Sequence, residues 1–411
     1  MKPLNDNTHP LESLLQQHCP NGVEYKELGE LFTIKNGYTP SKAKAEFWEG
    51  GTIPWFRMED IQANGRILKD SIQHITPQAV KGELFPANSI IISTTATIGE
   101  HALVIVDYLS NQQFTCLIPQ VNCCDKLSMR FMFYYGFILG EWCRNNVNKS
   151  AFPSVKMEQF KKFKIPLPPL EIQSKIVEIL DTFTELEAEL EAELEARLKQ
   201  YHYYRNKLLS HDELENRTAK SRNDSDPATL VPYVRLGEAC EILDNLRKPI
   251  TKSKRTQGIY PYYGANGIQD YVNEYIFDGD FLLMGEDGSV INKDNSPVLN
   301  WVSGKFWVNN HAHILKEKSN TTNLRFVFFY LQTCDVSSIV RGVPPKINQQ
   351  NLKTIQIPLP PLAVQNEIVE LLDKFDTLTN DLTSGIPAEI EARKKQYEYY
   401  RERLLSFIAK D

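Results

Sequence analysis

The chain has 411 residues, a net charge of −6 and 42% hydrophobic residues, which is ordinary for a globular protein of two or three domains. No run of about 18 apolar residues occurs and the N-terminal stretch lacks the features of a signal peptide, so neither membrane insertion nor secretion is expected. Seven cysteines without a C-x-x-C spacing argue against a disulfide framework and a zinc cluster, and together these features predict a cytoplasmic protein.

The first segment, residues 1–164, is expected to form an α+β domain. "SIIISTTATIGEHALVIV" (Ser89–Val106) predicts strands around a Thr-Ile-Gly turn, and few long helices are indicated. Cationic and aromatic residues in its polar stretches suit contacts to phosphates and base edges, although such stretches also fit solvated loops. The candidate DNA-binding residues in this segment are Lys35, Tyr38, Thr39, Ser41, Lys42, Lys44, Arg57, Lys149 and Lys156.

The next segment, residues 165–210, predicts one long helix. The prolines of "IPLPPL" exclude a helix before Leu170, and apolar residues then recur every three or four positions from Ile172 to Leu208. The central "AELEAELEARLK" consists of strong helix formers. A helix over about 171–210 would measure roughly 60 Å at 1.5 Å per residue. Because it cannot bury its apolar stripe alone, it must pack against another element.

The third segment, residues 211–356, again predicts strands and tight turns. "DFLLMGEDGSV" is followed by "KFWVNNHAHILK", where His311 and His313 are expected to alternate along a strand and point the same way. A metal site at this pair is disfavoured against a structural role. "RKPITKSKR" has five cations in nine residues and no acid. The candidate DNA-binding residues here are Arg247, Lys248, Lys252, Lys254, Arg255, Tyr262, Tyr263, Arg341 and Lys346.

The last segment, residues 357–411, repeats the second one. "FKIPLPPLEIQSKIVEILDTF" and "IQIPLPPLAVQNEIVELLDKF" agree at 13 of 21 positions, and "KQYHYYRNKLLS" returns as "KQYEYYRERLLS". The two helices are therefore expected to pair as an antiparallel coiled coil, with an interruption at Ser384–Pro387 in the second. A repeat of about 200 residues indicates a domain duplication with pseudo-two-fold symmetry.

Charge is distributed unevenly between these segments. Residues 171–210 carry 9 acidic and 5 basic side chains, and residues 361–411 carry 10 and 7, whereas residues 1–170 and 211–360 are near neutral. The negative net charge therefore belongs to the helices and does not argue against a nucleic-acid partner for the other two segments.

Enzyme motifs are missing from the chain. There is no G-x-x-x-x-G-K-[ST] phosphate loop, no G-x-G-x-x-G, no Asn/Asp-Pro-Pro-aromatic methyltransferase motif and no acid cluster with a lysine typical of a nuclease. This pattern favours a non-catalytic protein. A methyltransferase or nuclease with unrecognised motifs, and a coiled-coil scaffold that binds only protein, remain as alternatives.

The two variable segments, each closed by "IPLPPL…Q…I…LD.F" and a helix ending in "KQY.YYR..LLS", resemble the specificity subunit of type I restriction–modification systems. The repeated "AELE" unit resembles one subgroup of that family. The resemblance implies two target recognition domains, at 1–164 and 211–356, and helical spacers at 165–210 and 357–411. Each recognition domain would read half of a bipartite double-stranded DNA target, which is expected to be asymmetric because the two domains differ.

The resemblance also implies partners. Two modification methyltransferase subunits would dock on the helices, with Tyr203, Tyr204, Tyr399 and Tyr400 as candidate docking residues, and restriction motor-nuclease subunits would join them. This chain would bind no cofactor or metal itself, because S-adenosylmethionine, ATP and Mg belong to the partner subunits. A specificity subunit of a type II-like fused enzyme is the alternative within the same family.

Overall fold

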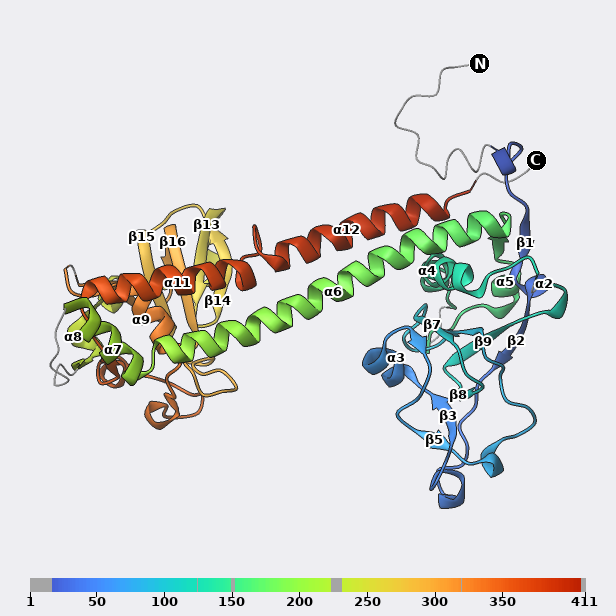
Figure 1. Ribbon diagram of the computed structural model, residues 1–411, viewed down its shortest axis with the longest axis horizontal. Helices are drawn as coiled ribbons and strands as arrows, with labels where there is room; N and C mark the ends of the chain where they lie inside the picture. The colour runs from blue at the N-terminus through green and yellow to red at the C-terminus, as the bar shows by residue number, and fades with distance from the viewer. Residues whose placement is uncertain (1–16, 124, 149–151, 223–230, 319, 408–411) are drawn as a thin grey trace, which may run out of the picture. The chain divides into compact units, whose positions relative to one another are not determined.

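The computed structural model describes residues 17–123, 125–148, 152–222, 231–318 and 320–407. The chain divides into two compact units (Figure 1): unit 1 comprises residues 1–189 and 391–411, and unit 2 comprises residues 190–390. Helices α6 (Leu170–Leu208) and α12 (Ile386–Leu405) each contribute to both units. Both units mix sheets with helices, which confirms the expected α+β class.

Unit 1 is built on a five-stranded sheet in the order β2-β9-β6-β7-β4. A second, three-stranded sheet has the order β5-β3-β8, and β1 pairs with β10. The strands are β1 (Tyr25–Glu27), β2 (Phe32–Asn36), β3 (Ile53–Phe56), β4 (Ile67–Leu68), β5 (His74–Ile75), β6 (Ser89–Ser93), β7 (His101–Val104), β8 (Leu109–Ser110), β9 (Phe114–Pro119) and β10 (Lys164–Pro166).

The main helix of unit 1 is α4 (Met129–Asn145), which lies between the sheet and α6 (Figure 1). The Ser128 hydroxyl caps its N-terminus by accepting from the Phe131 N–H. Gly140 allows a close approach, because a Cβ at this position would lie 2.3 Å from the Gly99 carbonyl oxygen. The shorter helices are α2 (Leu28–Leu31), α3 (Met58–Asn64) and α5 (Met157–Lys161).

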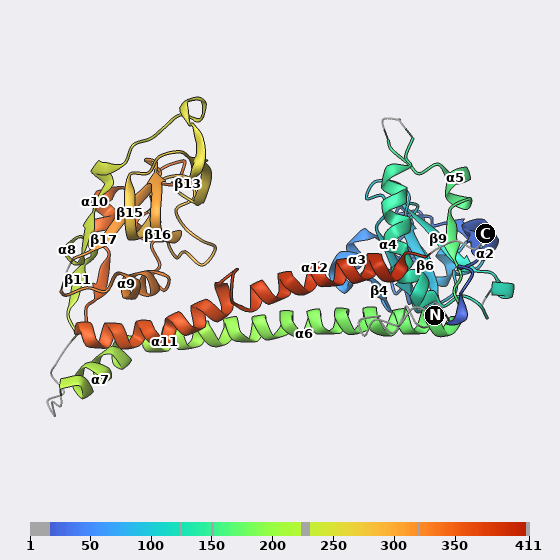
Figure 2. The same ribbon diagram turned by 90° about the horizontal axis from the view of Figure 1, so that it is seen from above.

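Unit 2 is built on a six-stranded sheet in the order β12-β17-β15-β16-β13-β14, with β11 paired to β18. Figure 2 shows α9 between this sheet and the helices α6 and α11. The strands are β11 (Tyr233–Arg235), β12 (Cys240–Ile242), β13 (Gln257–Gly264), β14 (Gly267–Val272), β15 (Phe277–Gly285), β16 (Leu299–Val308), β17 (Ala312–Glu317) and β18 (Gln356–Pro358). The helices are α7 (His211–Arg222), α8 (Leu236–Ala239), α9 (Leu324–Leu331), α10 (Gln349–Lys353) and α11 (Leu362–Asn380).

The repeated proline motif has the same structural role in both units. The residues at the start of the motif form β10 in unit 1 and β18 in unit 2. These strands pair antiparallel with β1 and β11, respectively. The motif's glutamine is fully buried at each position, Gln173 and Gln365. Gln173 donates to the Pro168 (2.8 Å) and Lys126 (2.7 Å) carbonyls and accepts from the Ser128 N–H (2.8 Å). The glutamine therefore joins the proline turn to the loop that starts α4.

Gln365 repeats this arrangement in unit 2. It donates to the Pro360 (2.7 Å) and Thr321 (2.9 Å) carbonyls and accepts from the Asn323 N–H (2.8 Å), just before α9. A residue that donates twice and accepts once must be an amide here, because glutamate has no N–H to give. The duplication inferred from the sequence thus extends to individual hydrogen bonds.

The long helices pair antiparallel within each unit, as expected. In unit 1, Phe183 of α6 stacks on Tyr400 of α12, and Glu187 forms an ion pair with Lys394 (3.3 Å). In unit 2, Tyr204 of α6 stacks on Phe375 of α11. The predicted interruption is also present, since α11 ends at Asn380 and α12 begins at Ile386.

The first part of each apolar stripe is buried differently from the expectation. Ile172, Ile176 and Leu180 lie in the same core as Phe131 of α4, so the helix that packs on the unit 1 sheet covers them. Val364, Ile368 and Leu372 of α11 likewise share a core with α9. Each unit therefore shares its core with the start of a long helix. None of the helices in the described residues is long and apolar enough to cross a membrane.

Candidate nucleic-acid interface

Four loops of unit 2 meet where β12 ends and β17 begins. Backbone hydrogen bonds tie three of them together: the Glu286 N–H donates to the His311 carbonyl (2.8 Å), and the Ile347 N–H donates to the Glu286 carbonyl (2.8 Å). The Arg247 side chain ties the fourth, because its Nη1 donates to the Ala312 carbonyl (2.9 Å). We call this the four-loop junction of unit 2, formed by residues 243–255, 286–290, 309–311 and 340–347.

Unit 1 has the same junction where β2 ends and β9 begins. The Thr94 N–H donates to the Gln113 carbonyl (3.1 Å), the Val155 N–H to the Thr94 carbonyl (3.0 Å), and the Tyr38 N–H to the Ser110 carbonyl (2.8 Å). The described part of the four-loop junction of unit 1 is formed by residues 37–44, 94–99, 111–113, 147–148 and 152–155. Two copies of one loop arrangement therefore occur in a single chain.

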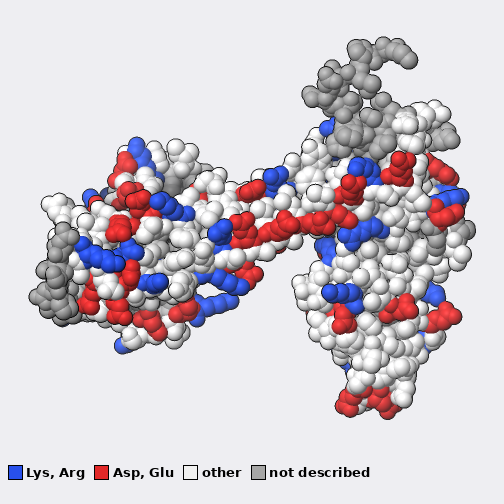
Figure 3. All heavy atoms as spheres, viewed as in Figure 1, with Lys and Arg blue, Asp and Glu red and all other residues white. Residues whose placement is uncertain are grey.

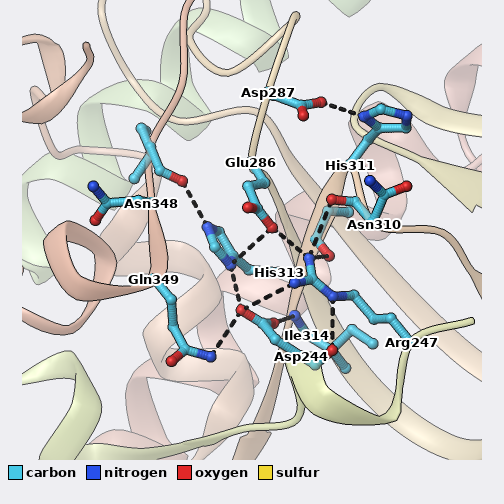
Figure 4. Close-up of polar contacts among 12 residues, drawn as sticks. Asp244, Arg247, Glu286, Asp287, Asn310, His311, His313, Ile314, Asn348 and Gln349 are labelled. Carbon is cyan, nitrogen blue, oxygen red and sulfur yellow. Dashed lines mark hydrogen bonds and ion pairs between the residues drawn. The ribbon is translucent and has the colours of Figure 1, made fainter.

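A buried ion-pair cluster fills the junction of unit 2 (Figure 4). His313, which is fully buried, contacts Asp244 through Nδ1 (2.7 Å) and the Ile347 carbonyl through Nε2 (2.8 Å). Arg247 adds a cation, bonded to Glu286 and 3.6 Å from Asp244. Lys346 also pairs with Glu286 (3.2 Å) at the edge of the cluster.

The charges of this cluster stabilise ionised Asp244. Burial raises the pKa of its carboxyl, but the hydrogen bond from His313 and the positive charges of His313 and Arg247 lower the pKa by more, so that it lies below its ordinary value. Gln349 donates a further hydrogen bond to the same carboxylate (3.0 Å).

Asp244, Glu286 and His313 also place three potential metal-ligand atoms within 4.8 Å of one another. A metal ion fits this arrangement poorly, because the Arg247 guanidinium already contacts both carboxylates and both nitrogens of His313 are engaged in hydrogen bonds. The cluster is therefore a structural support for the junction.

Neutral residues occupy the same place in unit 1. The hydroxyls of Thr94 and Thr115 bond each other (2.9 Å), and the Thr115 hydroxyl donates to the Asn36 side-chain oxygen (3.1 Å). Asn36 follows "LGE" at the same spacing as Asp244, and Thr115 stands in the strand that corresponds to the strand of His313. The two junctions share a backbone arrangement and differ in what fills them.

Residues 20–200 and 231–392 match the type I restriction modification DNA specificity domain. The chain belongs to this DNA specificity domain family. It is 43% identical over 376 residues to the type I restriction enzyme EcoprrI specificity subunit of Escherichia coli, covering 88% of this chain and 89% of that protein. It is also 32% identical over 320 residues to the EcoR124I/EcoR124II specificity subunit of Escherichia coli, covering 71% and 74%.

Solved structures of the DNA specificity family share the fold. The crystal structure of a type I restriction–modification S subunit from M. genitalium matches with a TM-score of 0.55 at 16% identity, covering 99% of each chain. A chain from a structural study of the assembly and conformational transition of the type I R-M system matches with a TM-score of 0.56 at 17% identity, covering 94% of this chain and 98% of that one. These matches agree with the two-unit, long-helix architecture expected from the sequence.

For a DNA specificity protein, the exposed cations are the first candidates for phosphate contacts. Most of the predicted basic residues are exposed, and Lys149 lies outside the described residues. Lys346 is exposed but pairs with Glu286 (3.2 Å). The exposed predicted residues are Lys35, Ser41, Lys42, Lys44, Lys156, Lys248, Lys252, Lys254, Arg341 and Lys346.

Three predicted residues of unit 2 are engaged inside the domain. Arg247 belongs to the buried cluster described above. Arg255 donates to the Ile250 carbonyl (3.1 Å), pairs with Asp270 (3.2 Å) and stacks over the Tyr262 ring (4.2 Å). The Tyr262 ring is buried. These three side chains shape the loop that presents the lysines and are not candidates for direct contact with DNA.

Predicted residues of unit 1 are also partly engaged. The Tyr38 hydroxyl donates to the Ala79 carbonyl (3.3 Å) and accepts from the Lys81 N–H (2.6 Å). The Thr39 hydroxyl bonds the Gln112 side-chain oxygen. Arg57 lies over the Trp55 ring (5.6 Å) and is half-buried. Tyr263 of unit 2 is similarly half-buried, against Phe306.

The expectation that His311 and His313 point the same way is wrong. His313 lies in β17 and is buried, whereas His311 precedes the strand and its side chain is 44% exposed, bonded to Asp287. The turn before β17 breaks the alternation. The sequence analysis also did not single out Gln112 and Asn310, although an asparagine three positions before the strand in both "NQQF" and "NNHA" marks the same turn.

Acidic side chains form a band along α6 (Figure 3). The exposed acidic residues in the central part of α6 are Glu185, Glu189, Glu191, Glu193 and Glu195. A surface with this charge repels a DNA backbone. DNA contacts of this DNA specificity protein are therefore expected at the loops.

The four predicted docking tyrosines fall into two pairs. Tyr204 and Tyr400 stack in the helix seam, as described above. Tyr203 and Tyr399 occupy the preceding position of each repeat and are 61% and 55% exposed. Tyr204 is itself 38% exposed, so the second pair offers the larger ring surface to a partner.

Proposed function

We propose that this chain is the DNA-recognition subunit of a type I restriction–modification system. The four-loop junction of each unit contacts one half of a split, asymmetric target in double-stranded DNA. The recognition domains correspond to residues 1–164 and 211–356, and the spacer helices to residues 165–210 and 357–411. The chain itself is not the catalyst in this proposal; it directs the enzymatic subunits to the site.

The observation that supports the proposal is the pair of equivalent junctions, each rimmed by exposed cations. Lysine side chains attract phosphates without regard to sequence and fix the protein on the duplex. Lys42 and Lys44 lie in the junction of unit 1, and Lys248, Lys252 and Lys254 in that of unit 2. Two different junctions in one chain suit a target whose halves differ in sequence.

The duplication supports two docking positions for modification methyltransferase subunits. Tyr203 and Tyr399 are exposed at equivalent places, so each repeat presents the same ring to a partner. Restriction motor-nuclease subunits complete the complex. In this proposal S-adenosylmethionine, ATP and Mg are bound by the partner subunits, and the complex acts on DNA in the cytoplasm.

The test uses the chain purified together with its methyltransferase subunits. Bound to a library of randomised duplexes, the complex should select and methylate a bipartite site. The triple variant Lys248→Ala, Lys252→Ala, Lys254→Ala should bind more weakly and reduce the slope of log K against log salt by about 0.9 for each phosphate that no longer binds a lysine. Lys374→Ala, an exposed lysine of α11, is the control and should leave the slope unchanged. A complex that selects no sequence at all would refute the proposal.

A further inference from the structure

The loop that enters β9 in unit 1 and the loop that enters β17 in unit 2 are held by the same turn. The Asn111 side-chain oxygen accepts from the Gln113 N–H (3.1 Å), and the Asn309 side-chain oxygen accepts from the His311 N–H (2.8 Å). Each loop is also joined to its neighbour, by Thr94 N–H to Gln113 carbonyl and by Glu286 N–H to His311 carbonyl. The residue at the tip therefore has a defined backbone position in both units.

That tip residue is an exposed amide in both units. It is Gln112 in unit 1 and Asn310 in unit 2. Figure 4 shows Asn310 beside His311, on the outer side of the buried cluster. In the described part of the chain, no hydrogen bond involves the side-chain amide of Asn310, and Gln112 uses only its oxygen, toward Thr39. Each tip thus keeps an N–H₂ group for an external partner.

Amide side chains are suited to reading bases. Asparagine and glutamine carry a donor and an acceptor that match the N6 and N7 positions of adenine in the major groove. Lysines, in contrast, supply sequence-independent attraction to phosphates. The exposed lysines of each junction can therefore position the duplex without specifying it. Of the arginines in the unit 2 junction, which could read guanine, Arg247 and Arg255 are engaged internally, whereas Arg341 is exposed and donates to the Val340 carbonyl (2.7 Å).

We propose that Gln112 and Asn310 are the specificity-determining residues at the tips of the two junctions, each contacting a base edge in its own half-site. This inference rests on the proposed function and adds which side chains read bases. His311 accompanies Asn310 in unit 2. Its Nδ1 carries a proton for the Asp287 carboxylate, which accepts only, so Nε2 remains to face the DNA, and Figure 4 shows this nitrogen pointing away from the cluster.

Asp287 is accordingly a positioning residue. It fixes the His311 ring without reaching the DNA itself. Its loop is anchored by an isolated antiparallel β-bridge between the backbones of Asp287 and Lys346. Asp287→Asn should weaken the preference that His311 supplies while leaving the preference at the Asn310 position in place. A merely structural role for Asp287 would instead lower thermal stability and affinity for all sequences alike.

The experiment compares Gln112→Ala and Asn310→Ala in the complex with methyltransferase subunits. Selection from randomised duplexes, read out as methylated sites, reports preference at every position of both half-sites. Gln112→Ala should relax one position in one half-site, by about tenfold to a hundredfold, and leave the other half-site unchanged. Asn310→Ala should do the reverse, so each variant is the control of the other. Both residues are exposed, and thermal melting of each variant should match the parent chain.

Other outcomes would overturn the inference. Unchanged preferences in both variants, or a uniform loss of affinity with preferences intact, would show that the tips do not read bases. A change in both half-sites from one variant would show that the effect is not local to one junction. In each of these cases the parent complex still selects a bipartite site, which separates failure of this inference from failure of the proposed function.

Discussion

Replacing Gln365 by alanine tests whether the repeated proline motif joins each recognition unit to its long helix. Gln365 makes three hydrogen bonds to backbone groups, and its side chain is fully buried. Truncation leaves the Asn323 N–H and the carbonyls of Pro360 and Thr321 without this partner. These groups belong to the start of α11 and to the loop before α9. Losing the hydrogen bonds that join them therefore weakens the attachment of α11 to α9.

The size of the effect follows from the number of unsatisfied groups. Each buried donor or acceptor that loses its partner costs about 1–3 kcal/mol, and water entering the space left by the side chain recovers part of this. We expect the free energy of unfolding of unit 2 to fall by about 3–5 kcal/mol. Gln365→Glu should be at least as damaging at neutral pH, because a carboxylate cannot donate to the Pro360 and Thr321 carbonyls and is buried with its charge.

Hydrogen exchange of the α9 backbone amides measures this effect within unit 2. Gln365→Ala should lower their protection by the stated free energy, and Gln173→Ala should do the same for α4 in unit 1. Asn366→Ala is the matched control, because Asn366 is adjacent and exposed and accepts one bond from Asn323 (2.8 Å). If the Gln365→Ala protein kept the protection of the parent to within about 1 kcal/mol, the proline motif would not be the joint.

Three further predictions follow from described contacts. Arg325→Ala removes ion pairs to Asp373 (2.7 Å) and Asp376 (2.6 Å) and should lower the stability of unit 2 by about 2–4 kcal/mol in denaturation; Arg325→Lys should recover less than half, and full recovery would contradict the two-carboxylate geometry. Tyr203→Ala should leave stability unchanged but weaken co-purification of methyltransferase subunits, whereas Tyr204→Ala should destabilise the seam by about 1–2 kcal/mol; the opposite pattern would refute the assignment. Burial lowers the pKa of His101 to about 4. The contribution of neutral His101 to the stability of unit 1 is therefore complete above pH 6.5 and falls by up to about 3 kcal/mol as the pH drops toward 4. A flat profile in pH-dependent melting, or the same slope in His101→Gln, would exclude this.

The helical part of the fold could be predicted from the sequence because its determinants are local. Proline placement, an apolar residue every three or four positions and strong helix formers define α6 within a residue or two of its observed ends. The repeat itself revealed the duplication. What covers the stripe could not be predicted, because the contact of Ile172 and Ile176 with α4 joins segments about forty residues apart.

The loop residues were harder for the opposite reason. A cation in a basic run looks exposed in the sequence, but Arg247 is engaged by Glu286, which is distant in the sequence and brought near only by the β12–β17–β15 order. His311 was assigned to a strand that begins one residue later. Residues whose role depends on which loops meet cannot be assigned before the sheet order is known.

The two junctions show how one scaffold can present two different surfaces. The proline joint and the cross-loop backbone bonds recur in both units, with the same glutamine hydrogen bonds at Gln173 and Gln365. The filling of the junction does change, from the small neutral trio of unit 1 to the charged cluster of unit 2. In the charged cluster, Arg247 offsets the negative charges of Asp244 and Glu286. Arg247 also holds the loop of residues 243–255 against the start of β17. In the proposed function, a changed buried filling alters the exposed loops while the joint to the helices stays intact, and this separation would permit two halves of a duplicated chain to recognise different sequences.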